Sequence, residues 1–127
     1  LYTSLAREGA LAEISFHWGQ LTPRPSKPAL IHQLGVRAHR TLRLIRATLE
    51  ELGSDVTGSA VPNYGRTQEI GAAVAFIGCD GLLVPSARWP CENLILFTDN
   101  LAMDVELEVL NVEEVPWQDW ARSAGLL

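Results

Sequence analysis

Two side chains near the start of the sequence are candidates for chemistry, Tyr2 and Glu13. Tyr2 belongs to a short extended start, and Glu13 belongs to the helix that we predict to follow it. Because a strand end and the next helix adjoin, both side chains can approach one cleft. Glu13 projects beside the apolar stripe of that helix, so we expect an acidic group at the rim of the core.

A loop between two apolar segments is the second candidate site. It spans residues 85–93 and contains Ser86 and Arg88. Loops that are held by buried strands are common places for binding and catalytic groups. The third candidate is the segment around Tyr64 and Arg66, at the beginning of a predicted helix, where free backbone N–H groups and the helix dipole favour an anion.

Each candidate also has an ordinary structural interpretation. Glu13 fits an exposed helix carboxylate, and Tyr2 fits a core or edge aromatic residue. Ser86 fits a turn residue after a proline, and Arg66 fits a solvent-exposed side chain. On residue type alone, these interpretations are the more common ones.

No metal site or disulfide is predicted. The histidines His17, His32 and His39 do not stand at ligand spacing from one another. Cys79 and Cys91 lie twelve residues apart without a CxxC pattern, so we expect reduced thiols, as in cytoplasmic proteins. The sequence also contains no glycine-rich phosphate loop, GxSxG pattern or HExxH pattern.

The composition indicates one globular domain over residues 1–127. Hydrophobic residues make up 47% of the chain and charged residues 20%, a balance typical of a fold with a packed core. The net charge of -5 argues against a nucleic-acid-binding surface as the main function, because phosphate contacts need clustered Lys and Arg. Arginines recur at every third position from Arg37 to Arg46, and we interpret them as a solvated face. No apolar run approaches about 18 residues and no leader opens the chain, so neither a membrane span nor a secretory signal is predicted.

Apolar residues at helical spacing predict three helices. Each has a recognisable end, either a Ser or Thr cap at its beginning or a glycine at its end. The predicted helices are one from a Thr3 or Ser4 cap to about Trp18, one over residues 47–52 with a stop at Gly53, and one from a Thr67 cap to Gly78.

Alternating apolar and polar residues predict half-buried strands, and short apolar runs predict buried strands. The half-buried strands are residues 29–45 and 105–109, and the buried strands are residues 82–84 and 94–98. Residues 19–28 and 54–65 are expected to be loops, and Pro116 to start a terminal turn in which Trp117 and Trp120 pack. Helices lie between strands without a regular βαβ repeat, which favours an α+β fold.

Three blocks of the sequence resemble the RES-domain family, the NAD-consuming toxins of bacterial toxin-antitoxin pairs. The opening LYTSLAREGALAE is similar to the family's tyrosine-bearing strand and the helix that ends in its glutamate. The segment GCDGLLVPSARWPCENLILF resembles the family's serine-bearing strand and loop. With TQEIGAAVAFIG between them, the similarity extends over nearly the whole chain.

The resemblance implies an ADP-ribosyltransferase-like α+β fold, a mixed sheet with flanking helices, and cleavage of the bond between nicotinamide and ribose in NAD. By this resemblance Glu13 is the family's glutamate, Ser86 is its serine, and Tyr2 is the aromatic residue placed against nicotinamide. NAD is then a substrate, and no cofactor is implied. The further candidates for contact with NAD are Arg88, Arg66 and Tyr64.

The chemistry suits these residue types. As nicotinamide leaves, the ribose becomes oxocarbenium-like, and a carboxylate such as Glu13 stabilises the developing positive charge. An aromatic face such as that of Tyr2 stacks on the cationic pyridinium ring. Ser86 would hydrogen-bond the ribose or the amide of nicotinamide, and Arg88 would contact phosphate. Water, inorganic phosphate or a protein side chain would each accept the ADP-ribose.

The sequence departs from the family's pattern in two places. The family's arginine is expected in a strand upstream of Tyr2, so we expect a RES-like domain that lacks its N-terminal part, with Arg66 or Arg88 as a partial substitute left open. The second departure is Gly9, where the family more often has a threonine. Glycine lowers helix stability by about 1 kcal/mol relative to alanine.

The sequence therefore predicts an NAD-degrading cytoplasmic toxin that is neutralised by a helix-turn-helix antitoxin of the Xre type. One alternative is a protein ADP-ribosyltransferase, which breaks the same bond with a different acceptor. Another is an inactive truncated remnant that binds only the antitoxin or binds nothing. No direct nucleic-acid partner and no membrane partner is expected, and a homo-oligomer is left open.

Overall fold

The computed structural model of the chain describes residues 1–53, 64–102 and 107–127. The helices in these ranges are α1 (Arg7–Gly19), α2 (Arg46–Glu51), α3 (Tyr64–Phe76), the 3-10 helix η1 (Thr98–Asn100) and α4 (Trp117–Ser123). The strands are β1 (Tyr2–Ser4), β2 (Ala29–Val36), β3 (Thr41–Arg43), β4 (Gly81–Pro85), β5 (Glu92–Leu96) and β6 (Leu107–Val115). Helices and strands follow one another without a regular repeat, so the predicted α+β fold is confirmed.

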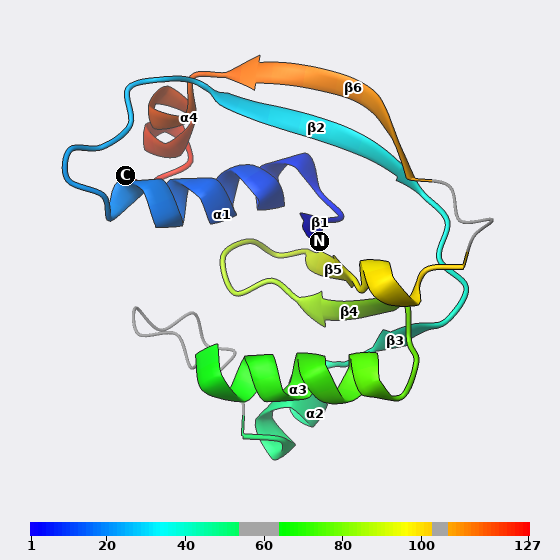
Figure 1. The fold of residues 1–127 in the computed structure, drawn as a ribbon. Coiled ribbons are helices and arrows are strands. Elements are labelled where there is room, and N and C mark those ends of the chain that lie inside the picture. Colours follow the sequence, from blue (N-terminus) through cyan, green and yellow to red (C-terminus); the bar gives the residue numbers. More distant parts are fainter. Residues whose placement is uncertain (54–63, 103–106) are drawn as a thin grey trace.

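Four strands form a mixed sheet in the order β1-β5-β4-β3. β5 is antiparallel to both of its neighbours, whereas β3 is parallel to β4. Figure 1 shows this sheet between α1 on one side and α3 on the other. Leu82 on β4 and Leu96 on β5 are 4% and 1% exposed, which confirms the two predicted buried strands. β5 begins and ends two residues earlier than the predicted strand 94–98, since it spans Glu92–Leu96 and Thr98 starts η1.

β2 and β6 pair as a separate antiparallel ribbon that arches over α1 and α4 (Figure 1). At one end of the ribbon, Ala29 joins the buried core that includes Trp117. The Trp117 indole N–H donates to the carbonyl of Pro25 at 3.0 Å, and its ring meets Trp18 edge-on with ring centres 5.7 Å apart. The segment after Pro116 is therefore a packed helix, α4, and not the predicted turn.

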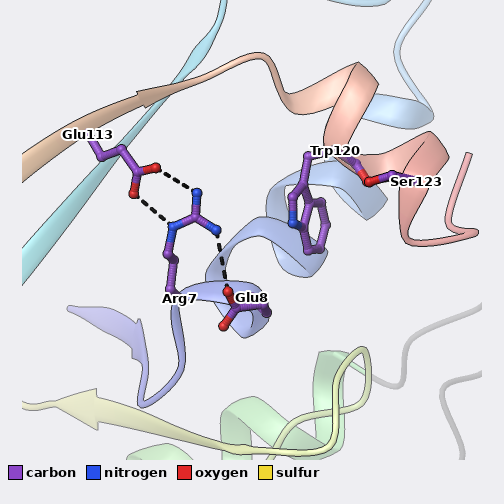
Figure 2. Close-up of polar contacts among 5 residues, drawn as sticks. All are labelled: Arg7, Glu8, Glu113, Trp120 and Ser123. Atoms are coloured by element: carbon purple, nitrogen blue, oxygen red, sulfur yellow. Dashed lines mark hydrogen bonds and ion pairs between the residues drawn. The ribbon is translucent and has the colours of Figure 1, made fainter.

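An ion pair connects α1 with the ribbon (Figure 2). Arg7 Nε and Nη2 donate to the two carboxylate oxygens of Glu113 at 2.7 and 2.6 Å. This bidentate bond holds the pKa of the Glu113 carboxyl below its usual range. Arg7 also contacts Glu8 at 3.3 Å. Because these side chains are exposed, the pair orients the ribbon more than it stabilises the fold.

The other end of the ribbon is exposed on both faces, so the prediction of a half-buried strand is wrong for much of β6. Leu107, Val109 and Leu110 are 43%, 57% and 56% exposed. The reason is that the ribbon has only two strands and that α1 and α4 lie beside its Val115 end (Figure 1). Val105, within the predicted strand, lies outside the described residues.

The predicted helix caps are wrong. Thr3 and Ser4 belong to β1, and Ala6 occupies the N-cap position of α1. Ser4 still assists the helix start, because its hydroxyl accepts the N–H of Ala6 at 3.4 Å. Thr67 lies inside α3, which begins three residues earlier at Tyr64.

The predicted glycine stops are confirmed. Gly53 follows α2 and Gly78 follows α3, with φ angles of 80° and 87°. This left-handed region is one that glycine adopts without steric cost.

The predicted strand 29–45 is two strands, because the chain bends between β2 and β3. The bend is held by Asp80, whose carboxylate accepts the N–H of His39 at 2.7 Å and of Arg40 at 2.9 Å. Asp80 is buried. Burial alone would raise the pKa of this carboxyl, but the two backbone hydrogen bonds outweigh it and hold the pKa below its usual range.

The arginines at positions 37, 40, 43 and 46 are all exposed, which confirms the predicted solvated face. None of the helices in the described ranges has the length and apolarity needed to cross a bilayer.

Asp80→Asn should lower the free energy of unfolding at pH 7 by about 1–3 kcal/mol, because an NH2 group would face a backbone N–H. Since the folded-state pKa is lowered, the carboxylate stabilises the fold above its unfolded pKa of about 4 and loses this contribution as the pH falls through the folded-state pKa. Urea unfolding of both proteins between neutral and acid pH measures this. A difference that does not shrink toward acid pH would contradict the role given to Asp80.

Candidate functional site

The main sheet and α1 position the first candidate residues. Between β1 and β5, Tyr2 pairs with Ile95 and Ser4 pairs with Asn93. Tyr2 and Asn93 are therefore diagonal neighbours on one face of the sheet, within reach of an aromatic side chain. α1 lies tightly against this face, since a Cβ atom at Gly9 would be only 2.3 Å from Ser4 Oγ.

Glu13 lies one helical turn beyond Gly9, on the same side of α1. Its Oε1 atom accepts three hydrogen bonds, from Tyr2 Oη at 3.3 Å, Ser86 Oγ at 3.2 Å and Asn93 Nδ2 at 3.2 Å. Asn93 Nδ2 also donates to Tyr2 Oη at 2.5 Å. We call Tyr2, Glu13, Ser86 and Asn93 the Glu13 cluster.

The donors of the Glu13 cluster are two hydroxyls and one amide, all of them neutral. They orient the Glu13 carboxylate without an opposite charge that would neutralise it. All three bonds go to Oε1, and Oε2 receives none from the part of the chain that the structure describes. The second oxygen therefore keeps its capacity to accept a hydrogen bond.

Tyr2 combines an exposed ring with a hydrogen-bonded hydroxyl. The residue is 57% exposed. Partial burial and the nearby Glu13 carboxylate raise the pKa of the Tyr2 hydroxyl above its usual value. The hydroxyl thus stays protonated at neutral pH and donates to Glu13, while the exposed ring remains open to a ligand.

Ser86 holds the loop that follows β4. It is buried, and its Oγ accepts the backbone N–H of Arg88 at 3.1 Å and of Trp89 at 3.3 Å. The Ser86 N–H donates to the carbonyl of Cys91 at 2.8 Å, which closes the loop. Ser86 is therefore the turn residue of the ordinary interpretation and also a partner of Glu13.

An open pocket of about 760 Å³ lies at this loop. Pockets for small molecules commonly measure about 300–1,000 Å³. Ser86 belongs both to the pocket lining and to the Glu13 cluster, whereas Tyr2 and Glu13 are not among the lining residues. The cluster and the pocket therefore adjoin at Ser86.

Two arginines line the pocket, Arg46 and Arg88. The guanidinium carbon of Arg88 lies 3.4 Å from the centre of the Phe16 ring, so the loop also contacts α1. Arg46 is the first residue of α2. Sequence reasoning missed Arg46 as a site residue, because it is one of the regularly spaced exposed arginines.

The other two candidates for contact with NAD lie on α3. Arg66 donates to the carbonyl of Leu52 and pairs with Glu69 at 2.8 Å, and it is not among the pocket-lining residues. The side chain of Tyr64 lies outside the described residues. The structure thus brings Tyr2, Glu13 and Ser86 together with Arg88 nearby, but does not bring Arg66 to them.

Sequence reasoning placed Asn93 at the end of the candidate loop 85–93 but did not single it out as a site residue. The predicted strand begins at Leu94, which leaves Asn93 in the loop. In the structure Asn93 lies inside β5 and is 1% exposed. The available signal was periodicity, because Asn93 precedes Ile95 by two positions and so shares its face of the sheet.

The described residues contain no group of three or more His, Cys, Asp or Glu that could hold a metal ion. Cys79 and Cys91 are free thiols. Cys91 Sγ lies 3.4 Å from Ser4 Oγ, and both atoms are close neighbours of Gly9 in α1.

Gly9→Ala should destabilise the protein by about 1–3 kcal/mol, because the new methyl group would crowd two neighbours. It would lie 2.3 Å from Ser4 Oγ and 2.5 Å from Cys91 Sγ. This crowding outweighs the gain of up to about 1 kcal/mol that alanine brings to a helix. Gly71→Ala in α3 is the matched control, since a methyl group there meets nothing within 4 Å and should stabilise. Equal stability of the two variants in urea would contradict the close packing at Gly9.

The comparison with known families decides the relationship. A family model described as the RES domain matches residues 1–118 of the 127-residue chain. The chain belongs to the RES-domain family. The resemblance found in the sequence is thus confirmed, and the whole Glu13 cluster lies within the matched span of the RES domain. No curated protein and no solved structure matches the chain.

In this RES domain, the resemblance assigns Glu13 as the family's glutamate and Ser86 as its serine. These two residues are 73 positions apart in the chain, yet their side chains are joined by a hydrogen bond of 3.2 Å. Arg88, two positions after Ser86, shares the pocket lining with it. Ser86 therefore connects the two parts of the site: it donates to Glu13 and lines the same pocket as Arg88.

Proposed function

We propose that this RES domain degrades NAD by cleaving the bond between nicotinamide and ribose. One observation carries the proposal: Glu13 is held through Oε1 by three neutral donors, and its Oε2 receives no hydrogen bond from the described residues. A fixed negative charge of this kind stabilises positive charge that develops in a transition state.

In the proposed step, the nicotinamide ribose lies beside the Glu13 carboxylate. The electron pair of the C–N bond leaves with the ring nitrogen, so the pyridinium cation becomes neutral nicotinamide. The ribose carries the positive charge as an oxocarbenium ion, which the carboxylate stabilises. Water then forms the new C–O bond and releases a proton, and the product is ADP-ribose.

The neighbouring residues would bind the rest of the substrate. The exposed ring of Tyr2 offers its face to the cationic pyridinium, an attraction that is lost once nicotinamide is neutral. Ser86 hydrogen-bonds the ribose or the nicotinamide amide. Arg88 is the candidate for the diphosphate, a role supported by its position in the pocket lining and by the affinity of guanidinium groups for phosphate.

We further propose that the protein is the cytoplasmic toxin of a type II toxin-antitoxin pair. Its partner would be a helix-turn-helix antitoxin of the Xre type that covers the entrance of the pocket. Membership in the RES-domain family supports this role. Expression of the chain alone should lower cellular NAD, and expression together with the antitoxin should restore it.

The acceptor of ADP-ribose is tested with NAD that carries a label in its adenosine part. Incubation with the purified protein should release free labelled ADP-ribose, or its phosphate when inorganic phosphate is present. Label retained on protein would instead support a protein ADP-ribosyltransferase. Intact NAD after long incubation would contradict the proposed activity.

Glu13→Gln should lower the rate of NAD cleavage by at least about 100-fold, because the side chain keeps its shape and loses the charge that stabilises the transition state. NAD consumption by the purified variant measures the effect. Glu8→Gln is the matched control on the same helix, since the Glu8 side chain contacts the exposed Arg7 and lies outside the Glu13 cluster. Equal NAD consumption by wild type and Glu13→Gln would remove Glu13 from the mechanism.

Tyr2→Ala should raise KM for NAD about tenfold, because loss of a stacked aromatic face costs about 1–2 kcal/mol of binding. Tyr2→Phe keeps the face and should change KM by less than about threefold. Leu1→Ala, at the neighbouring exposed position, is the control and should leave KM unchanged. If Tyr2→Phe raised KM as much as Tyr2→Ala, the hydroxyl and not the ring would be the binding group.

A further inference from the structure

We infer that Asn93 is the positioning residue of the Glu13 cluster: its side-chain amide fixes the Glu13 carboxylate and the Tyr2 hydroxyl in one arrangement. The inference rests on the proposed function, because it concerns how the proposed catalytic acid is held. It assigns Asn93 no contact with NAD.

The first support is the rigidity of the element that carries Asn93. β5 lies inside the sheet, where Asn93 pairs with Ser4 of β1 and with Val84 of β4. A residue flanked by strands on both sides has little freedom of its backbone, and its side chain is 1% exposed. Glu13 on α1 is therefore held by the Asn93 amide, which itself has little freedom to move.

The second support is the way in which the amide is used. Asn93 Nδ2 has two N–H bonds, and it donates to Tyr2 Oη at 2.5 Å and to Glu13 Oε1 at 3.2 Å. One planar group therefore sets the positions of an aromatic residue from β1 and an acid from α1. The amide is neutral, so Glu13 is oriented and keeps the negative charge that the proposed step needs.

The third support is the oxygen of the same amide. Asn93 Oδ1 is buried and has no hydrogen-bond partner among the described residues. A buried acceptor without a partner destabilises a fold, and an apolar side chain of similar size would avoid this. The two donated bonds, and not the stability of the core, account for an asparagine at this position.

Asn93→Leu separates positioning from folding. The variant should unfold at the same temperature as wild type or higher, because the unpaired oxygen is removed. Its kcat for NAD cleavage should fall on the order of 100-fold while KM stays nearly constant, since a misplaced carboxylate acts in the chemical step. Wild-type kcat in a folded Asn93→Leu protein would overturn the inference.

Asn93→Asp tests the inference through the pH dependence of kcat, which a purely structural role of Asn93 would not change. A carboxylate at this position would face Glu13. Two carboxylates at such a short distance hold one proton between them, and they lose it and repel each other as the pH rises. The titratable groups around position 93 are Tyr2 on β1, Glu13 on α1 and Cys91 in the loop. The ratio of variant to wild-type kcat should therefore rise as the pH is lowered from about 8 to about 5. A ratio that is independent of pH would overturn the inference.

Asn100 provides the matched control. Its Nδ2 also donates two hydrogen bonds, to the carbonyls of Ala75 at 2.8 Å and Cys79 at 2.9 Å, and it lies outside the Glu13 cluster. Asn100→Asp should lower the unfolding temperature and leave the pH dependence of kcat as in wild type. The same pH effect in both aspartate variants would overturn the inference.

A measurement without NAD keeps the inference separate from the proposed function. In proton–nitrogen NMR spectra, the side-chain NH2 signals of Asn93 should move in Glu13→Gln and in Tyr2→Phe, while those of Asn100 should stay in place. If wild type cleaves no NAD and these signals move, the proposed function fails, but the hydrogen bonds from Asn93 to Glu13 and Tyr2 are supported. If the Asn93 signals do not move in either variant, the inference fails, whatever the activity.

Discussion

The distance between α1 and the main sheet is the constraint on which the Glu13 cluster depends. Gly9 permits this distance with Ser4 and Cys91 in their present rotamers, because a Cβ atom there would displace Ser4 Oγ and Cys91 Sγ. Glu13 follows Gly9 by four positions and so lies on the same side of the helix, one turn along. A helix held further from the sheet would lift the carboxylate away from Asn93, and Glu13 would become the ordinary surface acid that its residue type suggests.

The cluster draws its four residues from four parts of the chain: β1, α1, the loop after β4, and β5. The hydrogen bond between Asn93 and Glu13 spans 80 positions, and that between Ser86 and Glu13 spans 73. None of these contacts forms within a single element, so the site exists only when the sheet is assembled and α1 is seated on it. Each donor is neutral, so the Glu13 carboxylate is the one charged group of the cluster, and the three hydrogen bonds fix its orientation.

Local patterns predicted much of the fold but not the features that depend on distant partners. The buried strands and the glycine stops after α2 and α3 follow from apolar runs and from backbone sterics. The bend that divides residues 29–45 depends on Asp80, about 40 positions away, and no local pattern reports it. Residue type and position marked Tyr2, Glu13 and Ser86 as candidates, and the family resemblance gave each of them a role. Asn93 was missed because a polar residue at the start of an apolar run looks like the end of a loop.

The resemblance gave Gly9 as a departure from a family that more often has a threonine, and local propensity counted it only as a loss of helix stability. The packing changes that interpretation. Ser4 and Cys91 together fill the space that a larger residue at position 9 would need. Gly9, Ser4 and Cys91 therefore pack as a set. A threonine at position 9 would require the Ser4 and Cys91 side chains to turn away, smaller neighbours on the sheet, or a greater distance between helix and sheet. In this chain the glycine is what allows an acid on a helix to reach an amide inside a sheet.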